Sequence, residues 1–507
     1  MTIDVGLRLA TDEAANQKTL RVALWLALAG VFAAAALLRV VLPFNVDVSW
    51  WIVVSERMFD GQRLYLDILE TNPPMAGSVY FLSVALARAI HIRPELATLC
   101  LIFVLIAASL ATTWHILRDS RLRSFAGALA VWAAVLLGIL PMYDFGQREH
   151  LALIVLLPAL AVFILRAGRE PVTPAAIVIA GLSAALTMTF KPYFACAVGA
   201  GILAAAAQAR DWRVFFALEN WIAGALVVLY GVGIYVLYPE YFTIVYPLVR
   251  DVYLLLKAPL LAICLTAATA VWLGGILVTL ALQNRQRTLD PACMVLLAAS
   301  AGFAVAFFVQ GKGWGYHAYP MVALSLMAAA CAVAAVDRDR LRSFRLRAVA
   351  AVVLVAMLAK ACLWFNASVD VRPIEEEVAR LGPHPKILML SAAAVIGHPM
   401  VRTLQGTWVS RQEAFWTREI VRRARLEEAI DAETEARLQV YIARERAGLI
   451  EDFTKQSPDV VLIDNKDSDW GNWAQADPEL SALLKAYTLV RTIDGVDILR
   501  RTSKPQS

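Results

Sequence analysis

The sequence has few charged residues and lacks any cysteine motif. Charged side chains make up 18% of its 507 residues and apolar ones 60%, which is too apolar for a single soluble core. The six cysteines lie in apolar runs without CxxC spacing, so neither a disulfide framework nor a zinc site is indicated. The formal net charge is only +5, and the basic residues fall in short loops, so no nucleic-acid partner is expected.

Two further motifs are missing. No Ala-x-Ala-like cleavage site follows the first apolar run, residues 22–42, which favours a retained first helix over a removed signal peptide. No glycine-rich phosphate fingerprint follows the first strand predicted in the C-terminal part, which argues against a dinucleotide site there.

The chain does have many apolar runs close to the ~20 residues that span a bilayer. This pattern predicts a polytopic α-helical membrane protein. Loops rich in arginine alternate with loops that have little, as the positive-inside rule predicts for cytoplasmic connections. With residues 1–21, the cytoplasmic segments are then 118–123, 166–170, 209–213, 283–287 and 337–347.

The remaining loops then face outward, and they contain the residues typical of a site. The outward breaks are 43–74, 143–150, 190–194, 238–253 and 310–320. Segment 75–90 cannot also cross without breaking the alternation, so we expect a partial or re-entrant helix and about 11 to 13 spans in residues 22–365. Arg39 lies near the outward end of the first apolar run, contrary to the positive-inside rule. Snorkelling of its side chain to the interface is the simpler interpretation, and anion binding is the alternative.

Residues 366–507 lose the membrane-length runs. Short apolar strands are predicted at 386–390, 459–464 and 496–501, and charged helices within 417–447. This pattern predicts a soluble α/β domain, which the alternation of loops places outside the cytoplasm.

The first outward loop, residues 43–74, predicts a short helix. Trp50, Trp51, Val54 and Met58 recur at near-helical spacing, and Ser49 or Asp47 can cap the helix, which Gly61 can close. We expect this helix to lie in the outer membrane interface. Pro73 and Pro74 suit the first turn of the next helix.

The segment DGQRLYLDILETNPPM (60–75), the acid at Asp47 and the stretch QGKGWGYHAYP (310–320) resemble the GT-C class of membrane glycosyltransferases. The likeness is greatest to bacterial relatives of the protein O-mannosyltransferase and lipid A aminoarabinose transferase families, and it covers most of the chain. Relatives often have two adjacent acids where this chain has the single Asp47, so a divalent metal is left open.

The resemblance implies an inverting transfer of a sugar, hexose or pentose, from a polyprenyl-phosphate carrier to a glycan, lipid or protein acceptor. Asp47 is the candidate catalytic base, with a helix cap as the alternative. The leaving phosphate needs cationic donors, and salt-bridged or snorkelling side chains are the alternative for each. The candidates for the carrier phosphate are Arg148, His150, Lys191, Lys312 and His317.

Four further residues are candidates for the sugar or the acceptor. Asp67 and Glu70 lie in segment 60–75, which we call the signature segment. Trp314 and Tyr316 lie in the stretch 310–320, which we call the late loop; the alternative for these two is a place in the aromatic belt of the membrane interface. A transporter or flippase is the rival class, but its ionisable residues should lie at mid-membrane in repeated halves. An O-antigen ligase-like enzyme is also open. In a bacterium the site and the C-terminal domain would face the periplasm.

Overall fold

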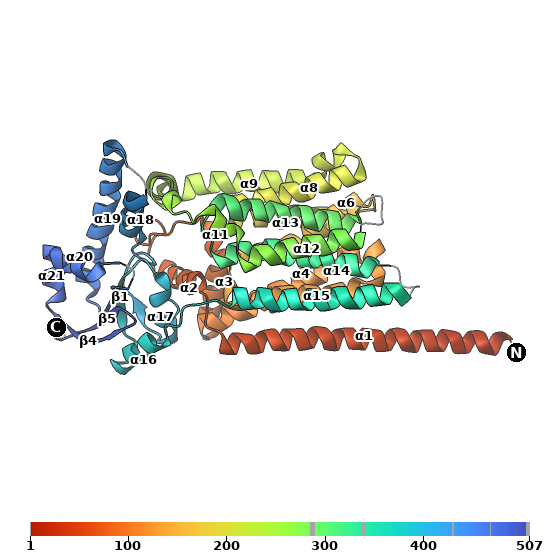
Figure 1. Ribbon diagram of the computed structural model, residues 1–507, viewed down its shortest axis with the longest axis horizontal. Coiled ribbons are helices and arrows are strands. Elements are labelled where there is room, and N and C mark those ends of the chain that lie inside the picture. Colours follow the sequence, from red (N-terminus) through yellow and green to blue (C-terminus); the bar gives the residue numbers. More distant parts are fainter. Residues whose placement is uncertain (1, 284–288, 337–340, 428–429, 467, 503–507) are drawn as a thin grey trace. The chain divides into compact units, whose positions relative to one another are not determined.

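The structure is a computed structural model that describes residues 2–283, 289–336, 341–427, 430–466 and 468–502 (Figure 1). The chain divides into two compact units, each built from separate parts of the sequence. Unit 1 comprises Met1–Pro43, Leu99–Leu229 and Pro259–Ala367, and unit 2 comprises Phe44–Thr98, Tyr230–Ala258 and Ser368–Ser507. Most of the predicted basic loop 283–287 and the first part of 337–347 lie outside the described residues.

Unit 1 is helical. Its helices, two of which (α4 and α9) extend a few residues beyond the unit, are α1 (Thr2–Val41), α4 (Pro94–Leu117), α5 (Ala126–Gly138), α6 (Arg148–Ala167), α7 (Pro174–Phe190), α8 (Ala195–Ala209), α9 (Leu218–Leu237), α11 (Leu260–Cys264), α12 (Ala267–Gln283), α13 (Pro291–Gln310), α14 (Tyr319–Ala335) and α15 (Leu341–Phe365). Single turns of 3-10 helix join several of them: η2 (Arg121–Ser124), η3 (Met142–Asp144), η4 (Pro192–Phe194), η5 (Trp212–Phe216) and η8 (Gly315–Ala318).

The described chain has eight helices that are long and apolar enough to cross a membrane. Four shorter apolar helices accompany them: Pro74–Ile90, Ala126–Gly138, Pro174–Phe190 and Ala267–Gln283. The predicted polytopic helical architecture is therefore confirmed.

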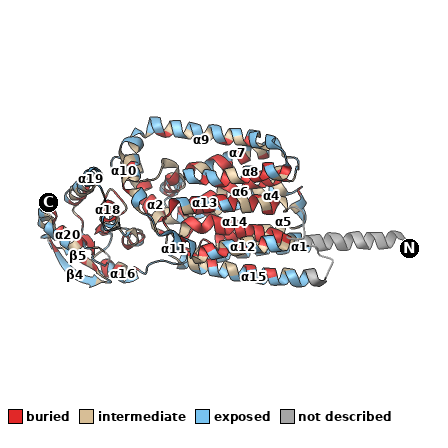
Figure 2. Cartoon of the chain, turned by 45° about the horizontal axis from the view of Figure 1, so that its top comes forward, coloured by how far each residue is buried: buried red, intermediate tan, exposed pale blue. Residues whose placement is uncertain are grey.

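The helices of unit 1 differ in how far they are buried. Within the spans, 89% of residues are buried in α6 and 78% in α14, but only 22% in α15 (Figure 2). The exposed side chains of α15 include Val349, Val352 and Leu363, which are apolar. Apolar exposure along a membrane-length helix is what a lipid-facing surface requires.

Glycine and proline shape the break between α13 and α14. Helix α13 ends at Gln310, and Gly311 follows with φ 64°, the left-handed conformation that helix ends favour and that glycine adopts without strain. After η8, Pro320 occupies the first turn of α14, where its missing N–H costs nothing. The four residues of η8 are thus held between two fixed helix ends.

Unit 2 combines helices with one sheet. Its helices are α2 (Val46–Phe59), α3 (Ser78–Ile90), α10 (Tyr246–Asp251), α16 (Arg372–Arg380), α17 (Met400–Thr403), α18 (Trp416–Glu427), α19 (Ala432–Gln456), α20 (Trp470–Ala476) and α21 (Pro478–Leu484). Short turns are η1 (Pro74–Gly77), the π-helical η6 (Tyr241–Val245), η7 (Tyr253–Leu255) and η9 (Ala394–Ile396).

The sheet has five strands in the order β2-β1-β3-β5-β4. They are β1 (Lys386–Leu390), β2 (Thr407–Trp408), β3 (Val460–Asp464), β4 (Tyr487–Ile493) and β5 (Val496–Arg501). Strand β1 pairs in parallel with β2 and β3, and β5 pairs antiparallel with β3 and β4. The three predicted strands are β1, β3 and β5. The predicted helical stretch 417–447 forms α18 and α19, which residues 428–431 separate; of these, 428 and 429 lie outside the described residues.

Two apolar clusters stabilise the C-terminal part of unit 2. The first lies around the sheet and contains residues of β1 and β3 together with Phe453 and Trp470. The second joins α18 and α19 to an earlier part of the chain; its buried members are Leu248, Val252, Ile420, Val421 and Leu438.

Helix α2 corrects the predicted cap. The helix begins after Asn45, whose side-chain oxygen accepts a hydrogen bond from the Asp47 N–H at 2.9 Å, so Asn45 is the cap and neither Asp47 nor Ser49 is. Gly61 follows the helix with φ 90°, as predicted. Residues 48–55 of α2 are all buried, so burial is not confined to one face of the helix.

Candidate active site

Unit 1 brings two of the predicted phosphate ligands, Lys191 and His317, into contact with one buried carboxylate, Glu149. Lys191 Nζ donates to Glu149 Oε1 at 2.7 Å and lies 3.0 Å from His317 Nε2. The side chains are 12%, 1% and 2% exposed for Lys191, Glu149 and His317 respectively. These three residues, which we call the Glu149 cluster together with the cations Arg148 and Lys312, come from helix ends that are far apart in sequence.

Each member is positioned by a helix terminus. Glu149 lies in the first turn of α6, Lys191 follows the last residue of α7 in an extended conformation before Pro192, and His317 lies on η8. Carboxylates are favourable near helix N-termini because of the positive end of the helix dipole. Lys191 does not continue α7, because the residue before a proline prefers an extended backbone.

The Glu149 cluster carries a net positive charge. The cations whose charges act on His317 are Lys191, Arg148 and Lys312. Arg148 and Lys312 are themselves 5% and 9% exposed. Asp144 lies close to η8, with its Oδ2 only 3.8 Å from where a Cβ on Gly315 would stand. Three cations therefore share this region with two carboxylates.

Aromatic rings cover one side of His317. The Tyr316 ring lies edge-on at a centroid distance of 4.5 Å, and the Trp314 ring lies at 5.4 Å. Trp314 and Tyr316 also contact each other at 5.8 Å and are only partly buried. The Nδ1 atom of His317 has no hydrogen-bond partner among the described residues.

His150, in contrast, is engaged by backbone on both sides. Its Nδ1 accepts from the Gly146 N–H at 2.9 Å, and its Nε2 lies 2.7 Å from the Leu137 carbonyl, to which it donates. Both ring nitrogens are therefore occupied in tying α6 to the end of α5, and the ring is 1% exposed. Asp144 belongs to η3, whereas Arg148 is the first residue of α6.

Arg39 lies near the same loop. Its guanidinium donates to the Met142 carbonyl and stacks over the Phe145 ring at 4.6 Å. Its Nε and one terminal nitrogen have no hydrogen-bond partner among the described residues. The residue is thus built into unit 1 through the 142–145 turn.

In unit 2, Asp47 lies in the first turn of α2 and is partly buried. The helix is anchored along its length. Ser49 Oγ lies 3.1 Å from His398 Nδ1, and Arg57 donates to the carbonyls of Ser410 at 2.8 Å and Trp408 at 2.6 Å. Burial, with the charges of Arg402 and Arg57, lowers the pKa of His398 to about 3, so this ring is neutral at physiological pH.

Glu70 is the most highly bonded of the predicted acids. It is 4% exposed, and its Oε2 accepts from Trp50 Nε1 at 2.6 Å. Its Oε1 accepts from the Asn72 backbone at 2.8 Å and from the Asn72 amide at 2.6 Å. Asp67 differs, because it is exposed and closes its own turn by accepting from the Arg63 N–H at 2.8 Å.

The tyrosines around Glu70 were not among the predicted site residues. The Tyr65 ring lies 5.8 Å from that of Tyr238 and 5.2 Å from that of Tyr241. Burial, then the Glu70 charge, raises the pKa of Tyr241 to about 12 and that of Tyr65 above its usual range, so both keep their protons at neutral pH. Only the tyrosine richness of segment 238–253 signalled this group.

Tyr65 also has a left-handed backbone. Its φ is 71°, which a bulky residue adopts only where the surrounding structure enforces it, at a cost of roughly 1–3 kcal/mol. Two hydrogen bonds hold it: its N–H donates to the Ile68 carbonyl at 2.7 Å, and its hydroxyl donates to the Asn72 carbonyl at 2.7 Å. The signature segment is therefore a fixed loop around Glu70.

A mixed polar and apolar cavity opens beside this loop within unit 2. Its volume, which includes open space at its entrance, is about 870 Å³. Tyr65 and Leu69 line it from the signature segment, and Tyr441, Arg444 and Glu445 line it from α19. Burial raises the pKa of Glu445, although backbone N–H groups of 417 and 418 donate to its carboxylate. In the described part of the chain, no three His, Cys, Asp or Glu side chains come close enough to hold a metal ion.

Comparison with known proteins gives one kind of match. No family model and no curated protein matches the sequence. Among solved structures, ArnT from Cupriavidus metallidurans bound to undecaprenyl phosphate is similar, with a TM-score of 0.57 at 13% identity over 96% of this chain and 99% of ArnT. The chain has the GT-C fold.

The GT-C fold is also matched by ArnT in the apo state, with a TM-score of 0.54 at 14% identity over 97% of this chain and all of that one. An archaeal oligosaccharyltransferase, AglB from Archaeoglobus fulgidus in complex with an inhibitory peptide and a dolichol-phosphate, gives a TM-score of 0.45 at 13% identity over 95% of this chain and 74% of AglB. The two ArnT matches confirm the fold that was predicted from segment 60–75 and the stretch 310–320.

Proposed function

We propose that the protein is an inverting glycosyltransferase, which moves a sugar from a polyprenyl-phosphate carrier to an acceptor on the outer face of a bacterial cytoplasmic membrane. The observation that supports this most is the Glu149 cluster, where three cations share buried helix ends with two carboxylates. Charges at the ends of membrane-length helices are costly unless they are paired or functional. An anionic group such as a phosphate would complete this charge balance, and the GT-C fold is consistent with it.

The reaction can be written for this chain. The acceptor hydroxyl oxygen forms a bond to the anomeric carbon while the bond from that carbon to the phosphate oxygen breaks. The hydroxyl proton passes to a base, and the polyprenyl phosphate leaves with the electron pair. We assign the base to Asp47 and the stabilisation of the leaving phosphate to Arg148, Lys191 and Lys312, with His317 beside them.

The other residues receive supporting roles. We infer that His150 positions α6, because both its ring nitrogens are bonded to backbone. Trp314 and Tyr316 would pack on the sugar. Glu70 would hold the signature loop and its tyrosines in place for the sugar or the acceptor, whereas Asp67 would act through the turn that it closes.

Transfer of radiolabelled sugar from a panel of polyprenyl-phosphate sugars to membrane extract tests the base. For Asp47→Asn we expect transfer to fall by about 10²- to 10⁴-fold, the range typical of a lost general base, with carrier binding unchanged. Asp60→Asn, at the other end of α2, is the matched control and should keep full activity. Full activity of Asp47→Asn would overturn the assignment.

Carrier binding tests the phosphate site separately. Arg148→Gln and Lys312→Met should each raise the dissociation constant of polyprenyl phosphate by roughly 10- to 100-fold, because a hydrogen bond to a charged group contributes about 1.5–3 kcal/mol. Lys360→Met, an exposed cation on α15, should bind normally. Unchanged affinity in both cluster variants would contradict a phosphate site there.

A further inference from the structure

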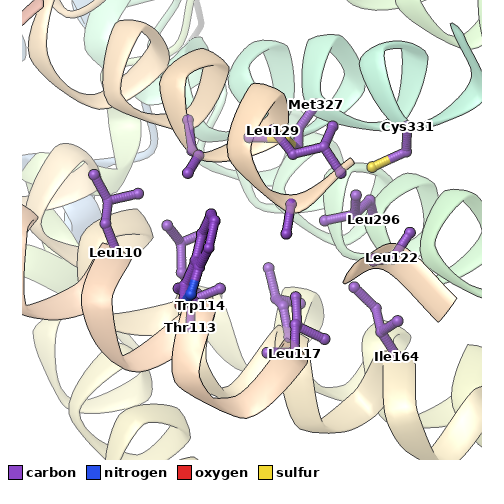
Figure 3. A pocket seen from close by; sticks show the side chains of 16 residues that line it. Leu110, Thr113, Trp114, Leu117, Leu122, Leu129, Ile164, Leu296, Met327 and Cys331 are labelled. Carbon is purple, nitrogen blue, oxygen red and sulfur yellow. The ribbon is translucent and has the colours of Figure 1, made fainter. Parts of the chain in front are cut away.

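A second hollow lies inside unit 1, among α4, α5, α6, α13 and α14 (Figure 3). It holds about 670 Å³ counted to its open mouth, and sixteen side chains line it. Nearly all of these are Leu, Ile, Ala or Met, and only Thr113, Trp114 and Cys331 carry a polar atom on the side chain. Water gains too few partners in such a cavity to be stable there, so hydrocarbon is the favoured filling.

The hollow is remote from the Glu149 cluster. Its lining on α6 runs from Leu157 to Ile164, which is 9 to 16 residues beyond Arg148 and therefore roughly 14–24 Å along the helix axis. On α14 the lining residues Met327 and Cys331 likewise follow His317 by several turns. Across a hydrocarbon core of about 30 Å, the hollow thus belongs to the opposite half of the helical bundle.

The loops next to the hollow are basic. Leu117 and Leu122, which line the hollow, enclose the loop 118–121, and Arg121 joins this loop to the next by donating to the Gly168 carbonyl at 3.1 Å. Three salt bridges form in and next to the two loops: Arg118 with Asp119, Arg121 with Glu170, and Arg166 with Glu219. Arg123 and Arg169 have no carboxylate partner among the described residues, which leaves two positive charges in excess.

Two lining residues near the C-terminal end of α4 carry polar groups. The Thr113 hydroxyl has no hydrogen-bond partner among the described residues and lies about one turn before Leu117. Trp114 is 39% exposed next to it, and tryptophan is enriched where membrane and water meet. The apolar lining and the unpartnered hydroxyl on α4 are therefore followed by a basic loop.

We propose that this hollow binds an acyl chain of an anionic phospholipid from the leaflet on the arginine-rich side. The chain fills the apolar space, the Thr113 hydroxyl donates to the ester carbonyl, and the phosphate lies at the arginines of the two loops. Basic residues near an anionic headgroup strengthen the binding of the lipid. This site is separate from the proposed transfer reaction, and its test does not depend on that reaction.

Native mass spectrometry of the full-length protein, exchanged into nanodiscs of phosphatidylglycerol or of phosphatidylethanolamine, tests the proposal. We expect wild type to retain one phosphatidylglycerol and to prefer it over phosphatidylethanolamine by about tenfold or more. Ala130→Phe, which fills the hollow from α5, should lose the lipid, whereas Ala128→Phe, exposed on the same helix, should keep it. A joint Arg123→Gln and Arg169→Gln variant should lose the preference.

Size-exclusion chromatography identifies any variant that does not fold, and Thr113→Val, which keeps the side-chain size, then replaces Ala130→Phe and should weaken retention. Equal retention by Ala130→Phe and Ala128→Phe would overturn the proposal, as would equal retention of the two phospholipids by wild type. Displacement of the lipid by added polyprenyl phosphate would assign the hollow to the carrier instead, and would also overturn it.

Discussion

Glu149 shows how a single buried charge is maintained inside a membrane-length helix bundle. Its side chain is 1% exposed, and its nearest cation is Lys191 at 2.7 Å. Removing one partner from a buried ion pair leaves an uncompensated charge, which costs about 3–5 kcal/mol, whereas replacing both by neutral groups costs much less. The stability of the pair and any part it takes in phosphate binding can therefore be separated.

A double-mutant cycle makes this separation. Lys191→Met should destabilise the protein strongly, and adding Glu149→Gln should restore much of the loss, with a coupling energy of about 1–3 kcal/mol in thermal or denaturant unfolding. Lys191→Arg retains the charge and should be nearly neutral. If Lys191 binds the carrier phosphate, the double variant recovers stability but not carrier affinity; purely additive effects would contradict the pair.

At the scale of elements, α2 is the helix that presents Asp47. Its N-terminus depends on Asn45, which satisfies the Asp47 N–H. Replacing an Asn cap by Ala typically costs about 1 kcal/mol. We expect Asn45→Ala to lower the unfolding free energy by about this amount, measured by thermal unfolding, and to slow transfer because the first turn frays. Asn45→Asp should preserve both, and an unchanged Asn45→Ala would argue that the helix is held by its anchors alone.

The sequence predicted helices and strands well where their burial produces a recognisable run of apolar residues. Strands β1 and β3 were found because their residues are almost all buried, and hence almost all apolar. Strand β2 is two residues long, and β4 has five consecutive exposed residues, so neither shows an alternation that could be read. The α2 cap was misplaced because Asn45, Asp47 and Ser49 are all good cap residues within five positions.

Pairings over long sequence distances were the part that the sequence could not supply. The Glu149–Lys191 contact bridges 42 residues, and the bond from Ser49 to His398 bridges 349. The tyrosines around Glu70 come from segments 60–75 and 238–253, which residue patterns treat separately. These contacts arise from packing, for which a local pattern carries no signal.

At the scale of the whole molecule, unit 2 is built from three separate segments. The apolar cluster around the sheet is made by the C-terminal segment itself, but the cluster of α18 and α19 needs Leu248 and Val252 from the second segment. The C-terminal segment is therefore only partly self-sufficient.

Residues 368–507 expressed alone test this division. We expect the sheet to keep slow amide hydrogen exchange, while amides of α18 and α19 exchange at least tenfold faster than in the full chain, because Ile420, Val421 and Leu438 lose their apolar partners. The full-length protein in detergent is the control. Equal protection of α18 in the fragment would show that the second cluster is dispensable.

The three-segment origin of unit 2 also bears on how the protein is made. Residues 44–98 leave the ribosome long before residues 368–507, and at about 5–20 residues per second the 409 residues between positions 98 and 507 take roughly 20–80 s to synthesise. During that interval Ser49 cannot yet contact His398, and Arg57 cannot yet donate to the carbonyls of Trp408 and Ser410. The apolar run of α2 therefore lacks these partners until residue 410 has been made, and we expect lipid or a chaperone to cover it during that time.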